Sequence, residues 1–330
     1  MGDNGKVRHQ GSSAACRALV LCAAVAVVAP LTAGCGARYV NAPPLAPGTF
    51  TVPDASVTRH VVLVSIDGLR PDAIDAFEAP TLQRLAREGS YSLTASTIVP
   101  SKTLPSHTSM LTGEPPERHG VLWNTLLAAE AGTTSVPTVF GVARSRGYRT
   151  AAFFSKSKFH ALQVPGTLDF SQAPRGWWGR WSAERTIDDV ERHLTAASPN
   201  LLFVHLTDPD RAGHRDGWMS RQYGLAVAVA DAALTRLLVA AEAAFGTGRY
   251  AVIVTADHGG HGHDHGSDDP RDLTIPWIAW GQGVAGTGEM PGASIRTIDT
   301  ASTVLWLLGV AEPTDWPGDP VMSAFVSAAE

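Results

Sequence analysis

Apolar runs rich in Val, Ile and Leu alternate with longer segments of helical spacing along most of this chain. One such run, at 60–66, reads HVVLVSI and is typical of a strand that is buried on both faces of a sheet. Strands of this kind separated by helices favour an α/β fold with a mostly parallel central sheet flanked by helices. Further strands are predicted over 150–154, 201–206, 250–255 and 275–280, and helices over 80–88, 140–146, 183–197, 221–245 and 297–308.

The composition is that of a globular protein rather than of a disordered, fibrous or polytopic membrane protein. Hydrophobic residues make up 44% of the 330, and the net charge is only -5, so most of the chain can bury a core. The negative net charge argues against a basic surface, and no stable nucleic-acid binding is expected. The Ala-rich helix predicted over 221–245 is assigned to core packing.

The first 35 residues predict an export signal. Basic residues up to Arg17 are followed by the apolar run ALVLCAAVAVVA at 18–29 and by PLTAGC at 30–35, which is the order found in a secretory signal peptide. The ending TAGC resembles a bacterial lipobox, with Leu31 one position earlier than usual, and this implies lipidation of Cys35. Ordinary secretion is the alternative.

We therefore predict a lipoprotein-type signal peptide over 1–34, a Pro-rich tether over 35–58 and a single domain over 59–330. The protein is expected to be exported and held by a lipid anchor at a membrane, at the cell surface or in the periplasm. All three cysteines precede the predicted domain. A metal ion in that domain would therefore be bound by His, Asp, Glu or hydroxyl groups, not by thiolates.

Acidic and histidine side chains follow three of the predicted strands. Ligands of such sheets bind beyond the carboxyl ends of the strands, so these side chains are expected to share one crevice. Carboxylates gathered there repel one another unless cations lie between them. Aspartate and histidine without cysteine suit divalent metals, zinc first and manganese second. The candidates are Asp67; Asp208, Asp210 and His214; Asp257 and His258; and His261, His263 and His265.

A hydroxyl-rich block, PSKTLPSH at 100–107, adds a possible nucleophile. A hydroxyl alone is a poor nucleophile, but coordination to a metal can ionise it. The alternative is structural, because a serine is a good helix cap and Ser106 could cap a helix that starts near it.

Taken in order, these segments resemble the alkaline phosphatase superfamily, and most closely its type I phosphodiesterase/nucleotide pyrophosphatase family. The resemblance covers about 61–284, and five ordered motifs are far more specific than any one of them. It implies an alkaline-phosphatase-like three-layer sandwich. The motifs are Ile-Asp-Gly at 66–68, Thr-x-Pro-x-His at 103–107, Asp-Pro-Asp-x-x-Gly-His at 208–214, Ala-Asp-His-Gly at 256–259 and a His-Gly ahead of Ile-Pro at 275–276.

The resemblance also implies roles for single residues. Thr103 matches the nucleophile, and Asn124 matches a phosphate-binding asparagine that would act with the Thr103 backbone N–H as an oxyanion hole. Two divalent metal ions are implied, most readily Zn²⁺, with Mn²⁺ second. His261 and then His263 are the alternatives to His265 as a ligand. The two ligand sets are Asp67, Thr103, Asp257 and His258 for one ion, and Asp210, His214 and His265 for the other.

The activity that the resemblance implies is hydrolysis of a small-molecule phosphate ester in two in-line steps, through a phospho-threonine intermediate. A phosphodiesterase or nucleotide pyrophosphatase is favoured. A phosphomonoesterase of the same superfamily needs further cations for the second phosphate charge. A lipid-anchored protein that binds metal or phosphate without turnover is another alternative. The candidate cations, which we predict instead to lie in solvated segments, are Lys102, Lys156, Lys158 and Arg175.

Overall fold

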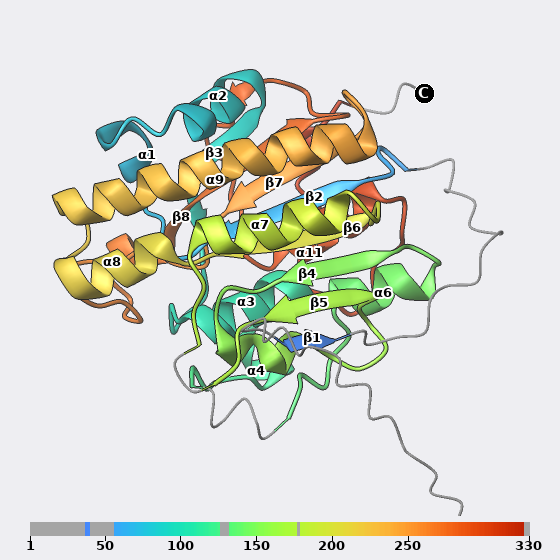
Figure 1. The fold of residues 1–330 in the computed structure, drawn as a ribbon, viewed down its shortest axis with the longest axis horizontal. Helices are drawn as coiled ribbons and strands as arrows, with labels where there is room; N and C mark the ends of the chain where they lie inside the picture. Colours follow the sequence, from blue (N-terminus) through green and yellow to red (C-terminus); the bar gives the residue numbers. More distant parts are fainter. Residues whose placement is uncertain (1–36, 40–55, 126–131, 177–178, 327–330) are drawn as a thin grey trace, which may run out of the picture. The chain divides into compact units, whose positions relative to one another are not determined.

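The computed structural model describes residues 37–39, 56–125, 132–176 and 179–326. The predicted signal peptide and the lipidation site at Cys35 lie outside these residues. The described strands form one nine-stranded sheet in the order β1-β5-β4-β6-β2-β7-β8-β3-β9 (Figure 1). Their bounds are β1 Ala37–Tyr39, β2 Val61–Ile66, β3 Ser90–Ser96, β4 Thr150–Phe153, β5 Phe170–Ala173, β6 Leu201–Leu206, β7 Ala251–Thr255, β8 Thr274–Gly281 and β9 Gly288–Glu289.

The middle of the sheet is parallel, as the sequence predicts. Strands β5, β4, β6, β2 and β7 are neighbours in that order and all run in the same direction. The two sides differ from this pattern, because β1 pairs antiparallel with β5 and β8 pairs antiparallel with both β7 and β3. The carboxyl ends of β6, β2 and β7 therefore lie side by side at one edge.

Helices cover both faces of the sheet, so the predicted three-layer arrangement is confirmed. Helices α7 and α9 lie over one face, and α3, α6 and α11 lie over the other (Figure 1). The helices are α1 Ala73–Ala76, α2 Pro80–Glu88, α3 Thr103–Thr112, α4 Pro116–His119, α6 Val139–Ser145, α7 Ala183–Leu194, α8 Asp208–Asp216, α9 Arg221–Phe245, α10 Pro270–Leu273 and α11 Asp299–Leu307, with 3-10 turns at Ser157–Leu162 and Met322–Ala324.

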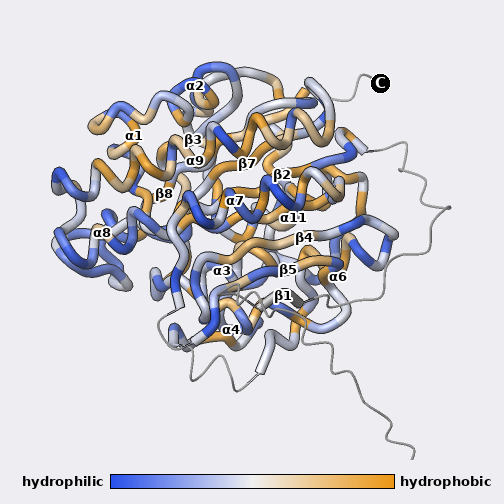
Figure 2. The backbone as a smooth tube through the Cα atoms, viewed as in Figure 1, coloured by the Kyte–Doolittle hydropathy of each residue, from blue (hydrophilic) through white to orange (hydrophobic). Residues whose placement is uncertain are grey.

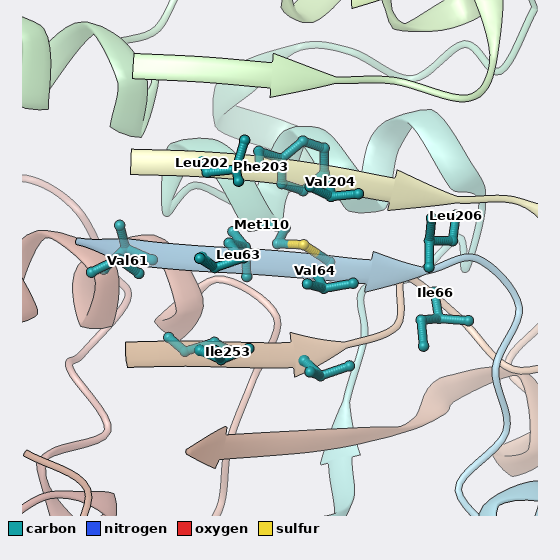
Figure 3. Packing of buried hydrophobic residues seen from close by; sticks show 14 of the residues in the cluster. Val61, Leu63, Val64, Ile66, Met110, Leu202, Phe203, Val204, Leu206 and Ile253 are labelled. Atoms are coloured by element: carbon teal, nitrogen blue, oxygen red, sulfur yellow. The ribbon is translucent and has the colours of Figure 1, made fainter. Parts of the chain in front are cut away.

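The core is centred on β2, whose six residues are all buried. Because helices cover both faces of the strand, neither face needs polar side chains, which explains why its sequence is a continuous apolar run. Figure 3 shows Val61, Leu63 and Val64 of β2 among residues of β6 and β7, with Met110 of α3 packed beside them. The central strands β2 and β7 are correspondingly largely hydrophobic in Figure 2.

Helix α9 is the one helix of the described residues that is long and apolar enough to cross a membrane by length and composition. Half of its apolar window is buried, however, and the helix packs on α7, α8 and α2. A side chain at Gly224 would collide with the ring of Phe77, since a Cβ there would lie 2.2 Å from it. This close packing agrees with the predicted role of α9 as a core helix.

Three local features of the structure differ from the sequence analysis or add to it. Residues 37–39 of the predicted tether form β1, which is hydrogen-bonded to the edge of the sheet. The helix expected to start near Ser106 starts at Thr103, so Ser106 lies inside α3 and is not its cap. The segment after β6, for which no helix was predicted, forms helix α8, and Pro209 in its first turn is compatible with helical backbone.

Candidate active site

Three aspartates meet where the central parallel strands end. Asp67 follows β2 directly, Asp257 lies two residues beyond β7, and Asp210 lies in the first turn of α8, just after β6. All three side chains are almost completely buried. The order β6-β2-β7 places them together, as the positions of the motifs at strand ends predict.

The first group of polar atoms surrounds Nε2 of His258. This nitrogen lies 3.4 Å from Asp67 Oδ1, 3.2 Å from Asp257 Oδ2 and 3.3 Å from Thr103 Oγ1. These are the four residues predicted to hold one metal ion. Thr103 is also the first residue of α3, so its backbone N–H has no acceptor within the helix, whereas the Leu104 N–H is bonded to Asn124 and Pro105 has no N–H.

The second group surrounds Oδ1 of Asp210. His214 Nε2 lies 3.3 Å from this oxygen, and His265 Nε2 lies 3.6 Å from it. The three ligand atoms of this group lie within 4.8 Å of one another, and so do those of Asp67, Asp210 and His258. The rings of His258 and His265 stack with their centroids 3.6 Å apart, so the two groups adjoin.

The three histidines are oriented alike. Their Nδ1 atoms lie at hydrogen-bond distance from backbone carbonyls, at 2.8 Å for His258, 3.0 Å for His214 and 2.7 Å for His265. A proton on Nδ1 leaves Nε2 as a lone pair facing the carboxylates, which is how metal-binding histidines are usually held. Burial, followed by the effect of the adjacent His265, lowers the pKa of His258 to about 3, so this ring is neutral.

One oxygen of each aspartate has no hydrogen-bond partner among the described residues. These oxygens are Asp67 Oδ1, Asp210 Oδ1 and Asp257 Oδ2. Burial and then the charge of Asp67 raise the pKa of Asp257 well above its ordinary value. A buried carboxylate oxygen without a donor is costly, and these oxygens face the histidine nitrogens. The donor set therefore fits divalent metal ions.

The other two candidate histidines lie elsewhere. His261 Nδ1 is 2.7 Å from Asp272 Oδ1, which directs this ring away from Asp210. His263 is exposed, and its Nδ1 lies 3.3 Å from the carbonyl oxygen of His214. Asp208 accepts a hydrogen bond from the backbone N–H of Ala183 and is outside both groups. Of the three histidines in the tract, His265 is the one that lies near Asp210.

Asn124 is held next to the start of α3. Its Oδ1 accepts hydrogen bonds from the backbone N–H of Leu104, at 3.0 Å, and from the ammonium of Lys158, at 2.9 Å. Because the oxygen faces these two donors, the amide NH₂ of Asn124 points away from Leu104 and Lys158. His119 supports the same segment, since its Nδ1 accepts from the Val121 N–H and its other ring nitrogen lies 3.0 Å from Ser109 Oγ.

The prediction that the lysines are solvated is wrong for Lys156 and Lys158. Lys156 is 2% exposed and forms ion pairs with Asp67 and Asp210, and Lys158 is half-buried against Asn124. Charged residues after a strand are usually solvated, but here buried carboxylates from distant segments compensate the charge of Lys156. Lys102 and Arg175 are exposed, as predicted.

His205 is a further residue that the sequence prediction missed. It lies in the otherwise apolar strand β6, is fully buried, and its Nε2 is 2.9 Å from Asp67 Oδ2. The Ser155 N–H donates to its Nδ1, so the proton on Nε2 is directed at Asp67. The sequence did contain an indication of this role: a single polar residue within an apolar, buried strand needs a buried hydrogen-bond partner.

Ser106 and His107 support the site from α3. The Ser106 hydroxyl donates to the backbone carbonyl of Asp257 at 2.7 Å. His107 Nδ1 lies 2.7 Å from the Thr103 carbonyl oxygen and 3.4 Å from Asp257 Oδ2. His107 therefore connects the nucleophile candidate to the aspartate of the first group, and Ser106 connects α3 to the same aspartate.

Trp218 packs against several of the segments that carry these side chains. A Cβ at Gly213 would lie 2.5 Å from its ring, and one at Gly260 would lie 2.2 Å from it. The indole Nε1–H donates to the backbone carbonyl of Gly68 at 3.0 Å. Glycine at these two positions therefore allows the ring to lie directly on the backbone.

A family model for type I phosphodiesterase/nucleotide pyrophosphatase matches residues 61–269, which contain every residue of both groups. The chain belongs to this family. The resemblance inferred from the five motifs is thereby confirmed.

Relatives and solved structures agree with this membership. GPI ethanolamine phosphate transferase 1 of Gibberella zeae is 27% identical over 84% of this chain and 33% of its own length. The chain thus spans about a third of that curated relative. Murine ectonucleotide pyrophosphatase/phosphodiesterase 5 has a TM-score of 0.68 at 16% identity, covering 81% of this chain and 100% of that one.

A mutant of the alkaline phosphatase PafA has a TM-score of 0.67 at 12% identity, covering 82% of this chain and 99% of that one. At such identities, the structural similarities establish the fold alone. The predicted alkaline-phosphatase-like architecture is confirmed by them.

Proposed function

We propose that this family member is a metal-dependent phosphodiesterase of the nucleotide pyrophosphatase type, with Thr103 as its nucleophile. The observation that carries the proposal is the convergence of three buried carboxylate oxygens without donors, three histidine Nε2 atoms and the Thr103 hydroxyl. A purely structural acidic cluster would have its oxygens hydrogen-bonded.

Each group has residues suited to one divalent ion, most readily Zn²⁺, with Mn²⁺ second. Asp67, Thr103, Asp257 and His258 would hold one ion, and Asp210, His214 and His265 the other. When bound, the ions would supply positive charge that lowers the pKa of a coordinated hydroxyl and stabilises charge on phosphoryl oxygens.

The protein's own groups account for the remaining steps. The Thr103 oxygen loses its proton to solvent and forms a bond to phosphorus, while the bond from phosphorus to the ester oxygen on the opposite side breaks and that oxygen takes up a proton from solvent and leaves as an alcohol. A phospho-threonine results, which for a diester still carries the second ester group. Hydrolysis of that intermediate by water restores the threonine. The amide NH₂ of Asn124, for which no hydrogen bond is recorded among the described residues, would donate to a phosphoryl oxygen. The backbone N–H of Thr103, the first residue of α3, would be a second donor to the same charge.

The substrate class can be tested by hydrolysis with the full-length protein. Bis-p-nitrophenyl phosphate, p-nitrophenyl phosphate and the p-nitrophenyl ester of thymidine monophosphate would each be supplied with zinc, manganese or a chelator. We expect turnover that the chelator abolishes and zinc restores, with diesters preferred. Metal bound without turnover of any ester would instead support a protein that only binds metal or phosphate.

The position of Lys158 favours phosphomonoester hydrolysis as a second candidate function. Its ammonium is 2.9 Å from Asn124, so it is close to the group that would bind the phosphoryl oxygens. Burial and then the charge of Lys156 lower the pKa of Lys158 to about 7. A dianionic phosphoryl group would favour the charged lysine and offset part of that burial cost.

If monoesters are substrates, Lys158→Ala should reduce their hydrolysis selectively. We expect kcat/KM for p-nitrophenyl phosphate to fall by about 10- to 100-fold, the loss typical of one hydrogen bond to a charged group, and the diester value to change much less. Arg175→Ala, which removes an exposed cation, is the control and should leave the ratio unchanged. Equal losses for both esters would argue against this role.

The predicted N-terminal organisation completes the proposal. The family match begins at residue 61, after the predicted signal peptide at 1–34 and the predicted tether at 35–58. We infer that the hydrolase domain is exported and that lipidation at Cys35 anchors it to a membrane. Its substrate is then a small-molecule phosphate ester outside the cytoplasm. Transfer to an alcohol instead of water, suggested by the name of the Gibberella relative, would appear as a new ester in the same assay.

A further inference from the structure

Lys156 lies between two of the aspartates that would bind metal. Its Nζ is 2.5 Å from Asp67 Oδ2 and 2.6 Å from Asp210 Oδ2. The side chain is buried, with 3% of its surface exposed. It reaches this position from the end of β4, whereas the two aspartates follow β2 and β6.

The two carboxylate oxygens of each aspartate have different surroundings. Asp67 Oδ2 is paired with Lys156 and His205, and Asp210 Oδ2 is paired with Lys156. The Oδ1 atoms have no hydrogen-bond partner among the described residues and are the atoms that face the histidines. The ammonium thus contacts the oxygens that are not needed as ligands, and it connects one metal-binding group to the other.

The backbone segments that carry the two carboxylates are held together. The Asp210 backbone N–H donates to the Asp67 backbone carbonyl at 3.0 Å. A Cβ at Gly68 would lie only 3.0 Å from the Asp210 Cα, so the two segments are in close contact. Two buried negative charges fixed in this way repel strongly unless a cation lies between them.

We propose that Lys156 is a positioning residue: an internal cation that balances Asp67 and Asp210 in the metal-free protein and keeps both Oδ1 atoms directed at the metal-binding groups. The inference rests on the proposed metal-dependent function. It implies that the domain folds with its site preassembled before any metal binds, and that metal binding contributes less to stability than it would without the lysine.

The test compares the melting temperatures of wild-type protein, Lys156→Met and Lys158→Met, each with a chelator and with zinc. Methionine keeps most of the side-chain volume and removes the charge. Lys158→Met is the matched control, since that lysine contacts Asn124 and neither carboxylate. Without metal, Lys156→Met should melt at least about 6 °C below the wild type, the shift expected when one partner of a buried ion pair is removed. Zinc should then raise its melting temperature by more than it raises that of the wild type.

A double variant keeps the test decisive if Lys156→Met does not fold without metal. Lys156→Met combined with Asp210→Asn removes one negative charge together with the lysine, so in chelator it should melt above Lys156→Met alone. The proposal is overturned if Lys156→Met melts like Lys158→Met without metal, if zinc stabilises it no more than the wild type, or if the double variant is no more stable. Absence of a zinc effect on the wild type would contradict the proposed function instead, and the chelator measurements would still decide the role of Lys156.

Discussion

Replacing Thr103 with alanine should lower turnover by roughly 10⁴-fold or more while leaving the domain folded, because removal of a covalent nucleophile usually has an effect of this size. The Thr103 hydroxyl lies 3.3 Å from His258 Nε2, and no other hydroxyl contact to the three histidines of the site is recorded among the described residues. The substitution removes few atoms, and position 103 is the first residue of α3, where a helix readily accommodates alanine. The measurement is the steady-state rate with the best diester at saturating zinc.

Thr112→Ala is the matched control for this prediction. Thr112 ends the same helix and its hydroxyl donates to the Thr108 carbonyl, so alanine there removes a buried threonine hydroxyl outside the site. Its rate should stay near that of the wild type. A Thr103→Ala protein that retains substantial turnover would exclude a phospho-threonine intermediate and would direct attention to a water nucleophile.

His265→Ala should reduce the bound zinc from two ions per chain to one and lower the rate by more than about 100-fold. The argument is geometric, because His265 is the residue of the histidine tract whose Nε2 faces Asp210. Loss of even an indirect support of a metal ligand typically costs 10- to 100-fold, so loss of a ligand should cost more. Zinc content by mass spectrometry and the zinc dependence of the rate would measure the two effects.

His261→Ala and His263→Ala provide the comparison. His261 is paired with Asp272, and His263 is exposed, so both variants should retain two zinc ions. If His261→Ala lost an ion while His265→Ala kept both, the ligand assignment would have to be reversed. Such a result would also require the 261–265 segment to adopt a different conformation when metal is bound.

Strands with a continuous apolar sequence were predictable, and those that depend on pairing were not. β6 was predicted with its observed bounds, and β2 to within one residue, since apolar runs of this kind have few alternatives to a buried strand. β3 has the polar sequence SYSLTAS and forms because it pairs with β8, which is nearly 180 residues away in the chain. Helix α3 was placed too late, because all ten of its residues are buried and no polar face marks its start.

The same distinction applies to the site. The aspartates and histidines were found because each follows a predicted strand within a recognisable motif. Lys156 was wrongly predicted to be solvated and His205 was not singled out, because what makes them functional candidates is a buried partner in another segment, namely Asp67. A local pattern does not reveal that a lysine will be desolvated, since the compensating charge comes from residues far along the chain.

The contact of Trp218 with Gly213, Gly260 and the Gly68 carbonyl restricts how this site can diverge during evolution. Any side chain at Gly213 or Gly260 would displace the indole ring, which also fixes the backbone next to Asp67. Substitutions at positions 213, 218 and 260 are therefore coupled. A larger residue at 213 or 260 is tolerated only if the residue at 218 is smaller. In an alignment of close relatives, the three should change together or remain unchanged, while the exposed face of α9 varies independently.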